Sequence, residues 1–201
     1  MTKTMKKFKL RDVKIQKVDP GQLNDRLLLI NLYLTQGLTL LIGLVILLFQ
    51  KRNPFHLFNF PNSVEFVYWG AGFAAVMFGA DMLLSRFISE ESMDDGGINS
   101  LLFRHRPIWH IVVIAAVVAV CEELLFRGAI QYGLGPYWTS ILFAAIHVRY
   151  LRHWIPTAWV FASSYGLGFI YVQTGTLWAP ILCHFLIDLV SGMVIKFRRE
   201  S

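Results

Sequence analysis

The chain has 201 residues, of which 55% are hydrophobic and only 16% are charged. In a soluble domain of this size about a quarter of the residues are charged. The composition therefore disfavours a soluble protein and indicates that the chain is surrounded by lipid. The net charge of +6 is expected to reflect membrane topology, and nucleic acid is not an expected partner.

The apolar residues occur in long blocks, and a helix needs roughly 20 of them to cross a hydrocarbon core of about 30 Å. These blocks predict an all-α polytopic membrane bundle of about six transmembrane helices. The fourth block is short, so it must be tilted, continue into the next loop or be sheltered by its neighbours. The predicted spans cover residues 27–49, 64–84, 109–131, 137–148, 154–172 and 177–195.

The spans divide the chain into four parts. A basic arm, 1–26, precedes two N-terminal transmembrane helices with their loop, 27–108. The polar residues that interrupt the spans are concentrated in a core, 109–195, and a short tail, 196–201, follows it.

Charge distribution predicts the orientation of these parts. If both termini face the cytoplasm, sixteen of the 19 Lys and Arg residues lie in inside segments, and only Lys51 and Arg52 lie outside. Cytoplasmic loops of membrane proteins carry such an excess. We therefore expect an integral protein of the cell membrane, in contact with membrane lipid, with both termini cytoplasmic.

Seven of the ionisable residues inside the predicted spans are candidate functional groups, because a charge costs roughly 2.5–3.5 kcal/mol at the bilayer centre and usually marks function. Counted from the outer edge at about 1.5 Å per residue, five of them from three helices reach depths of about 10–16 Å. We expect these helices to present them to one cavity, whereas Asp81 near the inner edge is expected to be a solvated or structural acid. The seven are Asp81, Glu122, Glu123, Arg127, His147, His184 and Asp188.

Spacing separates the two adjacent glutamates. Glu123 and Arg127 share a helix face and can form an ion pair, while Glu122 points about 100° away. An unpaired Glu122 could therefore act as a general base towards water. A purely structural ion pair explains Glu123 and Arg127 equally well.

The histidines leave a question about metals open. His147 and His184 could polarise a carbonyl, stabilise an oxyanion, or hold a metal such as zinc together with a glutamate. Asp188 is four residues after His184 and can orient its imidazole or face the same cavity. Neither HExxH nor HxxEH occurs in the sequence, so a divalent metal is possible but not established.

Three ordered motifs carry a resemblance to a known family. Glu122-Glu123-x-x-x-Arg127, Phe143-x-x-x-His147 and His184-x-x-x-Asp188 resemble the EExxxR, FxxxH and HxxxN/D motifs of the CPBP family of intramembrane proteases. That family includes the CAAX prenyl endopeptidases and bacterial proteins linked to bacteriocin self-immunity. The resemblance covers residues 117–193 and implies that 109–195 is the catalytic core of an all-helical membrane protease, a type often called a metalloprotease.

The resemblance also implies roles for the motif residues. Asp188 stands where asparagine is commoner in the family, and an ionised aspartate is a poor oxyanion donor. It would have to be protonated, orient His184 or ligate a metal. Prenylated substrates are not implied by this sequence. The implied site has a base and its helper (Glu122, His147), an oxyanion side (His184, Asp188) and a support (Glu123, Arg127).

These patterns predict an intramembrane endopeptidase that cleaves a peptide or a membrane-associated protein. Access from the cytoplasmic side is expected, because Arg149 and Arg152 follow His147 closely and must reach water. The alternatives are a non-catalytic membrane binding or immunity protein of the same fold and a proton-coupled carrier. The carrier is the least favoured, since the predicted spans show no inverted repeat.

Overall fold

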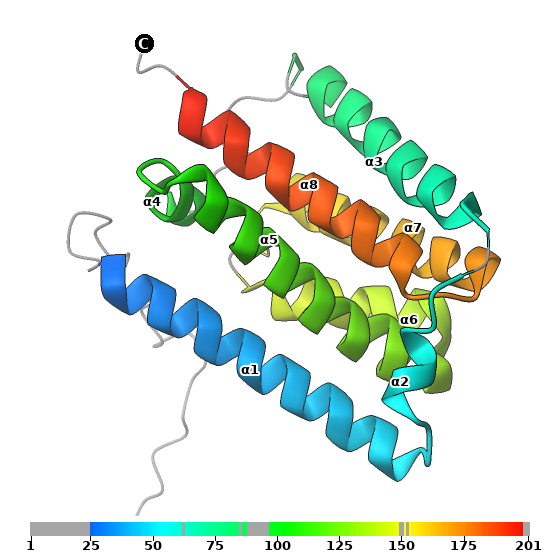
Figure 1. The fold of residues 1–201 in the computed structure, drawn as a ribbon. Helices are drawn as coiled ribbons and strands as arrows, with labels where there is room; N and C mark the ends of the chain where they lie inside the picture. Colours follow the sequence, from blue (N-terminus) through cyan, green and yellow to red (C-terminus); the bar gives the residue numbers. More distant parts are fainter. Residues whose placement is uncertain are drawn as a thin grey trace, which may run out of the picture.

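The computed structural model describes residues 25–61, 63–84, 86–87, 97–148, 151 and 153–198, and this part of the chain is a bundle of helices without a strand (Figure 1). Five helices are long and apolar enough to cross a membrane. The predicted all-α polytopic bundle is therefore confirmed. The elements are α1 (Asp25–Phe49), α2 (Pro54–Leu57), α3 (Glu65–Leu84), α4 (Ile98–Phe103), α5 (Ile108–Glu123), the π-helix η4 (Leu124–Ile130), α6 (Gln131–Ile146), α7 (Trp154–Thr174) and α8 (Trp178–Phe197).

Some sequence predictions fall on residues outside this description. They include nearly all of the basic arm, the acidic part of the loop before α4 and the last residues of the tail. Arg149 and Arg152, on which the expected cytoplasmic access rests, also lie outside the described residues.

The third and fourth predicted spans form one helical run, Ile108–Ile146, so five membrane-length helices are found where about six were expected. The run turns at Gly135, whose φ of 74° and ψ of 171° suit a residue without a Cβ. Pro136 follows and cannot donate a backbone hydrogen bond to the preceding turn. The segment after the turn is about 16 Å long at 1.5 Å per residue, roughly half of a hydrocarbon core. It packs against η4 and α7, the shelter that its shortness requires.

Small residues bring the outer helices close to the core. A Cβ added to Gly43 of α1 would lie 3.2 Å from the Cα atom of Leu125 in η4. A Cβ added to Gly70 of α3 would lie 2.7 Å from the carbonyl oxygen of Ala179 in α8. Such close approaches are typical of helix packing in lipid, where dispersion contacts and hydrogen bonds hold helices together.

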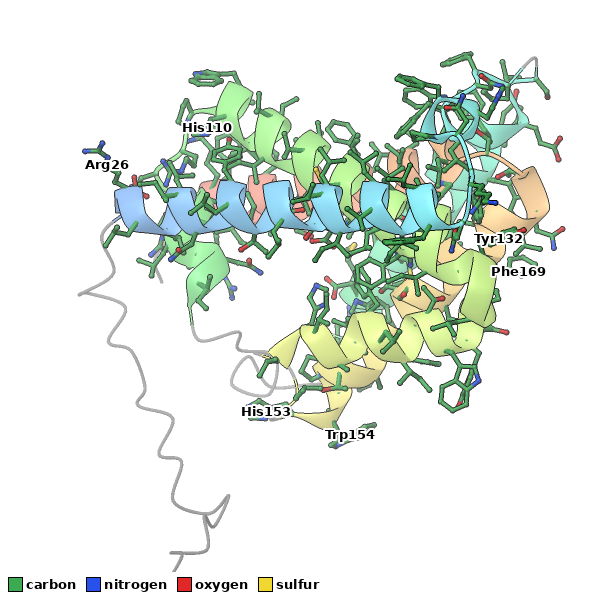
Figure 2. The ribbon with its side chains drawn as sticks, turned by 90° about the horizontal axis from the view of Figure 1, so that it is seen from below. Arg26, His110, Tyr132, His153, Trp154 and Phe169 are labelled. Atoms are coloured by element: carbon green, nitrogen blue, oxygen red, sulfur yellow. The ribbon has the colours of Figure 1, made fainter. Side chains whose placement is uncertain are left out.

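The start of α1 and the end of α8 lie at the same end of the bundle. Arg106, before α5, forms an ion pair with Asp25 at the start of α1, and its backbone carbonyl accepts a hydrogen bond from Lys196 Nζ at 2.6 Å. Figure 2 shows Arg26 and His110 at this end and Tyr132 and Phe169 at the other. The two ends of the described chain therefore lie on one side, as the predicted orientation requires.

Candidate active site

The adjacent glutamates end α5 and lead directly into the π-helical segment η4. Glu123 is fully buried and Glu122 is half-buried. A π-helix has wider turns than an α-helix, occurs rarely, and is frequently found at functional sites. Arg127 lies in the middle of η4 and is also fully buried, so the two charges of the predicted ion pair are both inside the protein.

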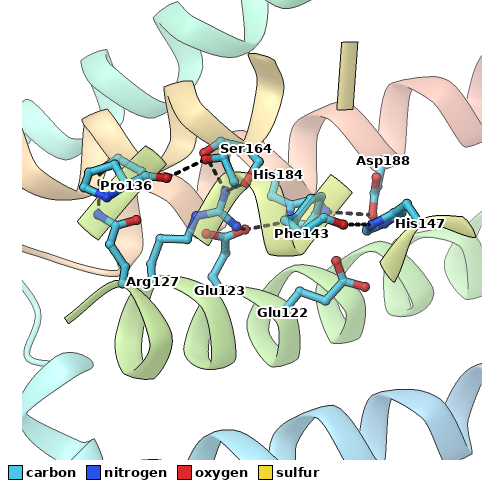
Figure 3. A network of polar contacts seen from close by, with 12 residues as sticks. Glu122, Glu123, Arg127, Pro136, Phe143, His147, Ser164, His184 and Asp188 are labelled. Atoms are coloured by element: carbon cyan, nitrogen blue, oxygen red, sulfur yellow. Dashed lines mark hydrogen bonds and ion pairs between the residues drawn. The ribbon is translucent and has the colours of Figure 1, made fainter. Parts of the chain in front are cut away.

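A single oxygen of Glu123 is the centre of a polar network (Figure 3). Glu123 Oε1 accepts a hydrogen bond from Arg127 Nη1 at 3.0 Å and another from His184 Nδ1 at 2.8 Å. The ion pair expected from the spacing is present. The contact with His184 was not predicted, because it joins residues 61 positions apart on α5 and α8.

The guanidinium extends the network to α7. Arg127 Nη2 donates to the backbone oxygen of Ser164 at 2.7 Å and to its hydroxyl at 2.9 Å. Three of the Arg127 hydrogen bonds therefore go to two different helices. A buried charge is tolerated only when it is paired and hydrogen-bonded in this way, so the network fixes α5, η4, α7 and α8 relative to one another.

His184 lies between two carboxylates. Its Nδ1 must carry a hydrogen to donate to Glu123, while its Nε2 lies 3.6 Å from Oδ2 of Asp188. This second distance is in the ion-pair range and longer than a hydrogen bond. Orientation of the imidazole was one of the roles considered for Asp188, and the shorter contact on this ring is the one with Glu123. The Asp188 side chain is 29% exposed.

His147 is placed by the end of α6. It is the residue that terminates the helix, and its Nδ1 lies 2.7 Å from the carbonyl oxygen of Phe143. Since a carbonyl oxygen only accepts, Nδ1 is inferred to carry the hydrogen, and in the neutral ring Nε2 then has the lone pair. A nitrogen in this state can accept a proton or a hydrogen bond.

Phe143 is the common wall of the site. Its ring stacks on the His147 ring with centroids 4.4 Å apart, and the His184 ring meets it edge-on at 6.4 Å. The Arg127 guanidinium lies over the same ring at 5.2 Å from its centroid. The second motif therefore does more than supply a histidine, because its phenylalanine brings the residues of the other two motifs together.

Glu122 points away from the Glu123 network. Its Oε1 accepts a hydrogen bond from Gln36 Nε2 of α1 at 3.1 Å. Figure 3 shows its carboxylate projecting towards the side on which His147 and Asp188 lie, whereas Arg127 is on the other side of Glu123. The 100° separation expected for neighbouring helical residues is thus reflected in different surroundings.

The structure links five of the predicted site residues through direct contacts or through Phe143, and places Glu122 beside them. Asp81 is exposed in the last turn of α3, and no contact described for this network includes it. The residues that the sequence analysis missed are polar side chains without charge: Gln36, which holds Glu122, Ser164, which holds Arg127, and Gln131, whose amide donates to the Gly168 carbonyl at 2.9 Å.

The donors of the site do not fit a metal ion. Within the described residues, no group of three or more His, Cys, Asp or Glu side chains is arranged to hold one. We therefore derive no step of the chemistry through a metal.

Two cavities in the described structure lie away from these residues. One of about 310 Å³ is at the start of α1 and includes Asp25, His105 and Arg106 in its wall. The other, of about 570 Å³, is an open apolar groove between α3 and α7. The single cavity expected around the polar residues stays a prediction.

The part of the chain that carries the three motifs matches a known protein family. Residues 104–190 match the family described as type II CAAX prenyl endopeptidase Rce1-like. The chain is also similar to the uncharacterized protein YpbD of Bacillus subtilis (strain 168), with 38% identity over 136 residues, which are 68% of this chain and 72% of that protein. No solved structure matches the chain.

Proposed function

Because the chain belongs to the type II CAAX prenyl endopeptidase Rce1-like family, we propose that it is an intramembrane endopeptidase that hydrolyses peptide bonds of a peptide or membrane-associated protein. The observation that carries this proposal is the different pairing of the two adjacent glutamates. Glu123 is bound to Arg127 and His184, and Glu122 keeps a half-buried carboxylate beside them.

Glu122 is the general base of the proposed reaction. The oxygen of a water molecule bonds to the carbonyl carbon of the scissile peptide while one of its protons passes to the Glu122 carboxylate. When the carbon–nitrogen bond breaks, the same proton passes to the leaving amine. The Nη1 and Nη2 atoms of Arg127 donate to Glu123 and Ser164 and not to this carboxylate. General acid–base catalysis of this kind contributes typically 10²–10⁴-fold to a rate.

His147 assists at the same water. Its Nδ1 hydrogen is held by the Phe143 carbonyl, so in the neutral ring Nε2 is the nitrogen with acceptor character. In the proposed reaction Nε2 accepts a hydrogen bond from the second hydrogen of the water, which stays on the water oxygen. The position at the end of α6 suits this role, since the stack on Phe143 fixes the ring at the level of the Glu123 network.

His184 and Asp188 form the side that stabilises the oxyanion. Glu123 holds His184 through Nδ1, so the ring is fixed before the substrate arrives. In the proposed reaction His184 is the imidazolium between two carboxylates, and its second N–H, at Nε2, is the preorganised donor to the oxyanion. Asp188 lies at ion-pair distance from Nε2 and orients this end of the ring. Glu123 and Arg127 support the site and do not contact the reacting atoms.

The proposed setting is the cell membrane, with both termini in the cytoplasm and lipid around the exposed apolar faces. The proposed substrate class is a peptide or a membrane-associated protein.

The test compares the native chain with Glu122→Gln and Glu65→Gln, each reconstituted in proteoliposomes and incubated with a solubilised membrane-protein fraction. Chemical labelling of new N-termini followed by mass spectrometry identifies the cleavages. We expect cleavages with the native chain and with Glu65→Gln, whose glutamate is exposed at the start of α3, but none with Glu122→Gln. Equal sets of N-termini in all three samples would contradict the proposal and favour a non-catalytic binding protein.

A further inference from the structure

Helix α1 contributes a polar residue to the site although it lies outside residues 104–190, the part that matches the family. Gln36 is near the middle of this helix, 6% exposed, and its amide donates to Glu122 Oε1 at 3.1 Å. Through this hydrogen bond α1 contacts Glu122, the proposed base.

The placement of Gln36 follows from the packing of α1. The buried residues of this helix are Gln36, Gly43 and Leu47, whose separations of seven and four positions place them on one face. The glycine allows that face to approach η4 closely, since an added Cβ would lie 3.2 Å from the Leu125 backbone. Gln36 therefore lies on the face of α1 that packs against the core, and its side chain reaches Glu122 at the end of α5.

The two polar atoms of the Gln36 amide are used unequally. Its nitrogen donates to Glu122, whereas its oxygen is buried and has no hydrogen-bond partner in the described structure. A buried polar atom without a partner is unfavourable, so the interaction that this side chain contributes is the one made by its donor. A donor held on one carboxylate oxygen restrains the position of that oxygen and leaves Oε2 for another partner.

We propose that Gln36 is a positioning residue for Glu122, so that α1 completes a site whose other residues lie in the family-matched helices. The amide holds Oε1 of Glu122, so that Oε2 is turned towards the water that it activates. This inference rests on the proposed role of Glu122 as the base and adds a residue of this chain to it.

A different explanation is that Gln36 only attaches α1 to the core, as interhelical hydrogen bonds do in membranes. The chain contains a matched example of that function. Gln50, just after α1, donates through Nε2 to the Ala129 carbonyl of η4 at 2.9 Å and does not contact a glutamate. A purely adhesive Gln36 should therefore behave like Gln50 when its amide is removed.

The kinetic test uses Gln36→Met and Gln50→Met, which keep the length of the side chain and remove the donor. The probe is a synthetic peptide spanning a cleavage site found by the N-terminal labelling, presented to proteoliposomes. We expect kcat to fall about 10–100-fold in Gln36→Met with KM unchanged, part of the 10²–10⁴-fold that a general base supplies. Gln50→Met should keep kcat within about twofold of the native value, since it removes only an adhesive contact.

Two results would overturn the inference in different ways. If Gln36→Met keeps the native kcat, or loses no more than Gln50→Met, while Glu122→Gln is inactive, Gln36 is only adhesive and the proposed function stands. If Glu122→Gln keeps the native kcat, both the function proposed for Glu122 and the role of Gln36 are wrong.

A second measurement tests the contact without activity. In a background with Cys121→Ala and Cys183→Ala, the pair Gln36→Cys and Glu122→Cys is treated in membranes with a short bifunctional methanethiosulfonate. The control pair moves the first cysteine to Gly37, where an added Cβ meets no atom within 4 Å. Cross-linking of 36 with 122 but not of 37 with 122 supports the proposed geometry, and equal or absent cross-linking overturns it.

Discussion

The two sides of the α5 end differ in how deeply their charged groups are buried and in which helices hold them. On the Glu123 side, the carboxylate and the guanidinium of Arg127 are both 0% exposed and are tied to α7 and α8. On the Glu122 side, the carboxylate is half-buried and is held by Gln36 of α1. Two identical side chains at neighbouring positions therefore have very different surroundings.

The difference separates support from chemistry. A fully buried network cannot bind a substrate without losing its own hydrogen bonds, and removing one partner leaves a charge uncompensated. A half-buried carboxylate can exchange its partner for water at a much smaller cost. We therefore expect substitutions on the Glu123 side to lower stability and substitutions on the Glu122 side to lower activity.

The largest effect on stability is expected for Arg127→Met. It removes the cation between Glu123 and Ser164 and leaves a buried carboxylate without its main partner, which costs about 3–5 kcal/mol. The free energy of unfolding can be measured by SDS titration in mixed micelles. Arg52→Met is the control, because Arg52 is half-buried, donates to the Gly128 carbonyl and stacks on Tyr132, so we expect a loss of at most about 1.5 kcal/mol. Equal losses would show that the Glu123 network is not special.

A large effect on activity with a small effect on stability is expected for His147→Ala. The half-buried ring supplies an acceptor nitrogen to the proposed water, so kcat should fall about 100-fold, within the range for general acid–base groups. Peptide cleavage in proteoliposomes measures it, with His153→Ala as the control because that exposed histidine precedes α7. A native kcat in His147→Ala would contradict the proposed role of His147 at the reacting water.

A smaller effect is expected for Ser164→Ala. The hydroxyl bond to Arg127 is lost, but the Ser164 carbonyl still accepts from the same guanidinium nitrogen, so stability should fall by about 1.5 kcal/mol. The neighbouring Ser163 hydroxyl donates only to the Trp159 carbonyl within its own helix, and Ser163→Ala should cost about 0.5 kcal/mol or less. The same SDS titration compares the two. A larger loss in Ser163→Ala would contradict the assigned network.

Local spacing was enough to predict part of this structure. Apolar blocks of about 20 residues gave the long helices, and the four-residue separation of Glu123 and Arg127 gave their ion pair. The predicted spans placed a break before residue 137, but the conformation of the turn at Gly135 was not predicted. Glycine before proline marks a break, but the direction of the next segment depends on its packing against η4 and α7.

Contacts between distant helices were beyond the sequence patterns. The Glu123–His184 hydrogen bond joins two helices whose relative rotation no local pattern specifies. Gln36 could have been noticed, because it shares a helix face with Gly43 and Leu47, the spacing of a packed face. It was missed because only ionisable residues within the spans were treated as functional.

The paired substitutions Glu122→Gln and Glu123→Gln test most directly whether the adjacent glutamates divide catalysis and support. Both stability by SDS titration and peptide cleavage are measured on each. We predict that the free energy of unfolding of Glu122→Gln lies within about 1 kcal/mol of the native value and that its kcat falls at least 100-fold. The free energy of unfolding of Glu123→Gln should be lower than the native value by about 3 kcal/mol or more. A Glu122→Gln protein that cleaves at the native rate, or one as unstable as Glu123→Gln, would contradict this division.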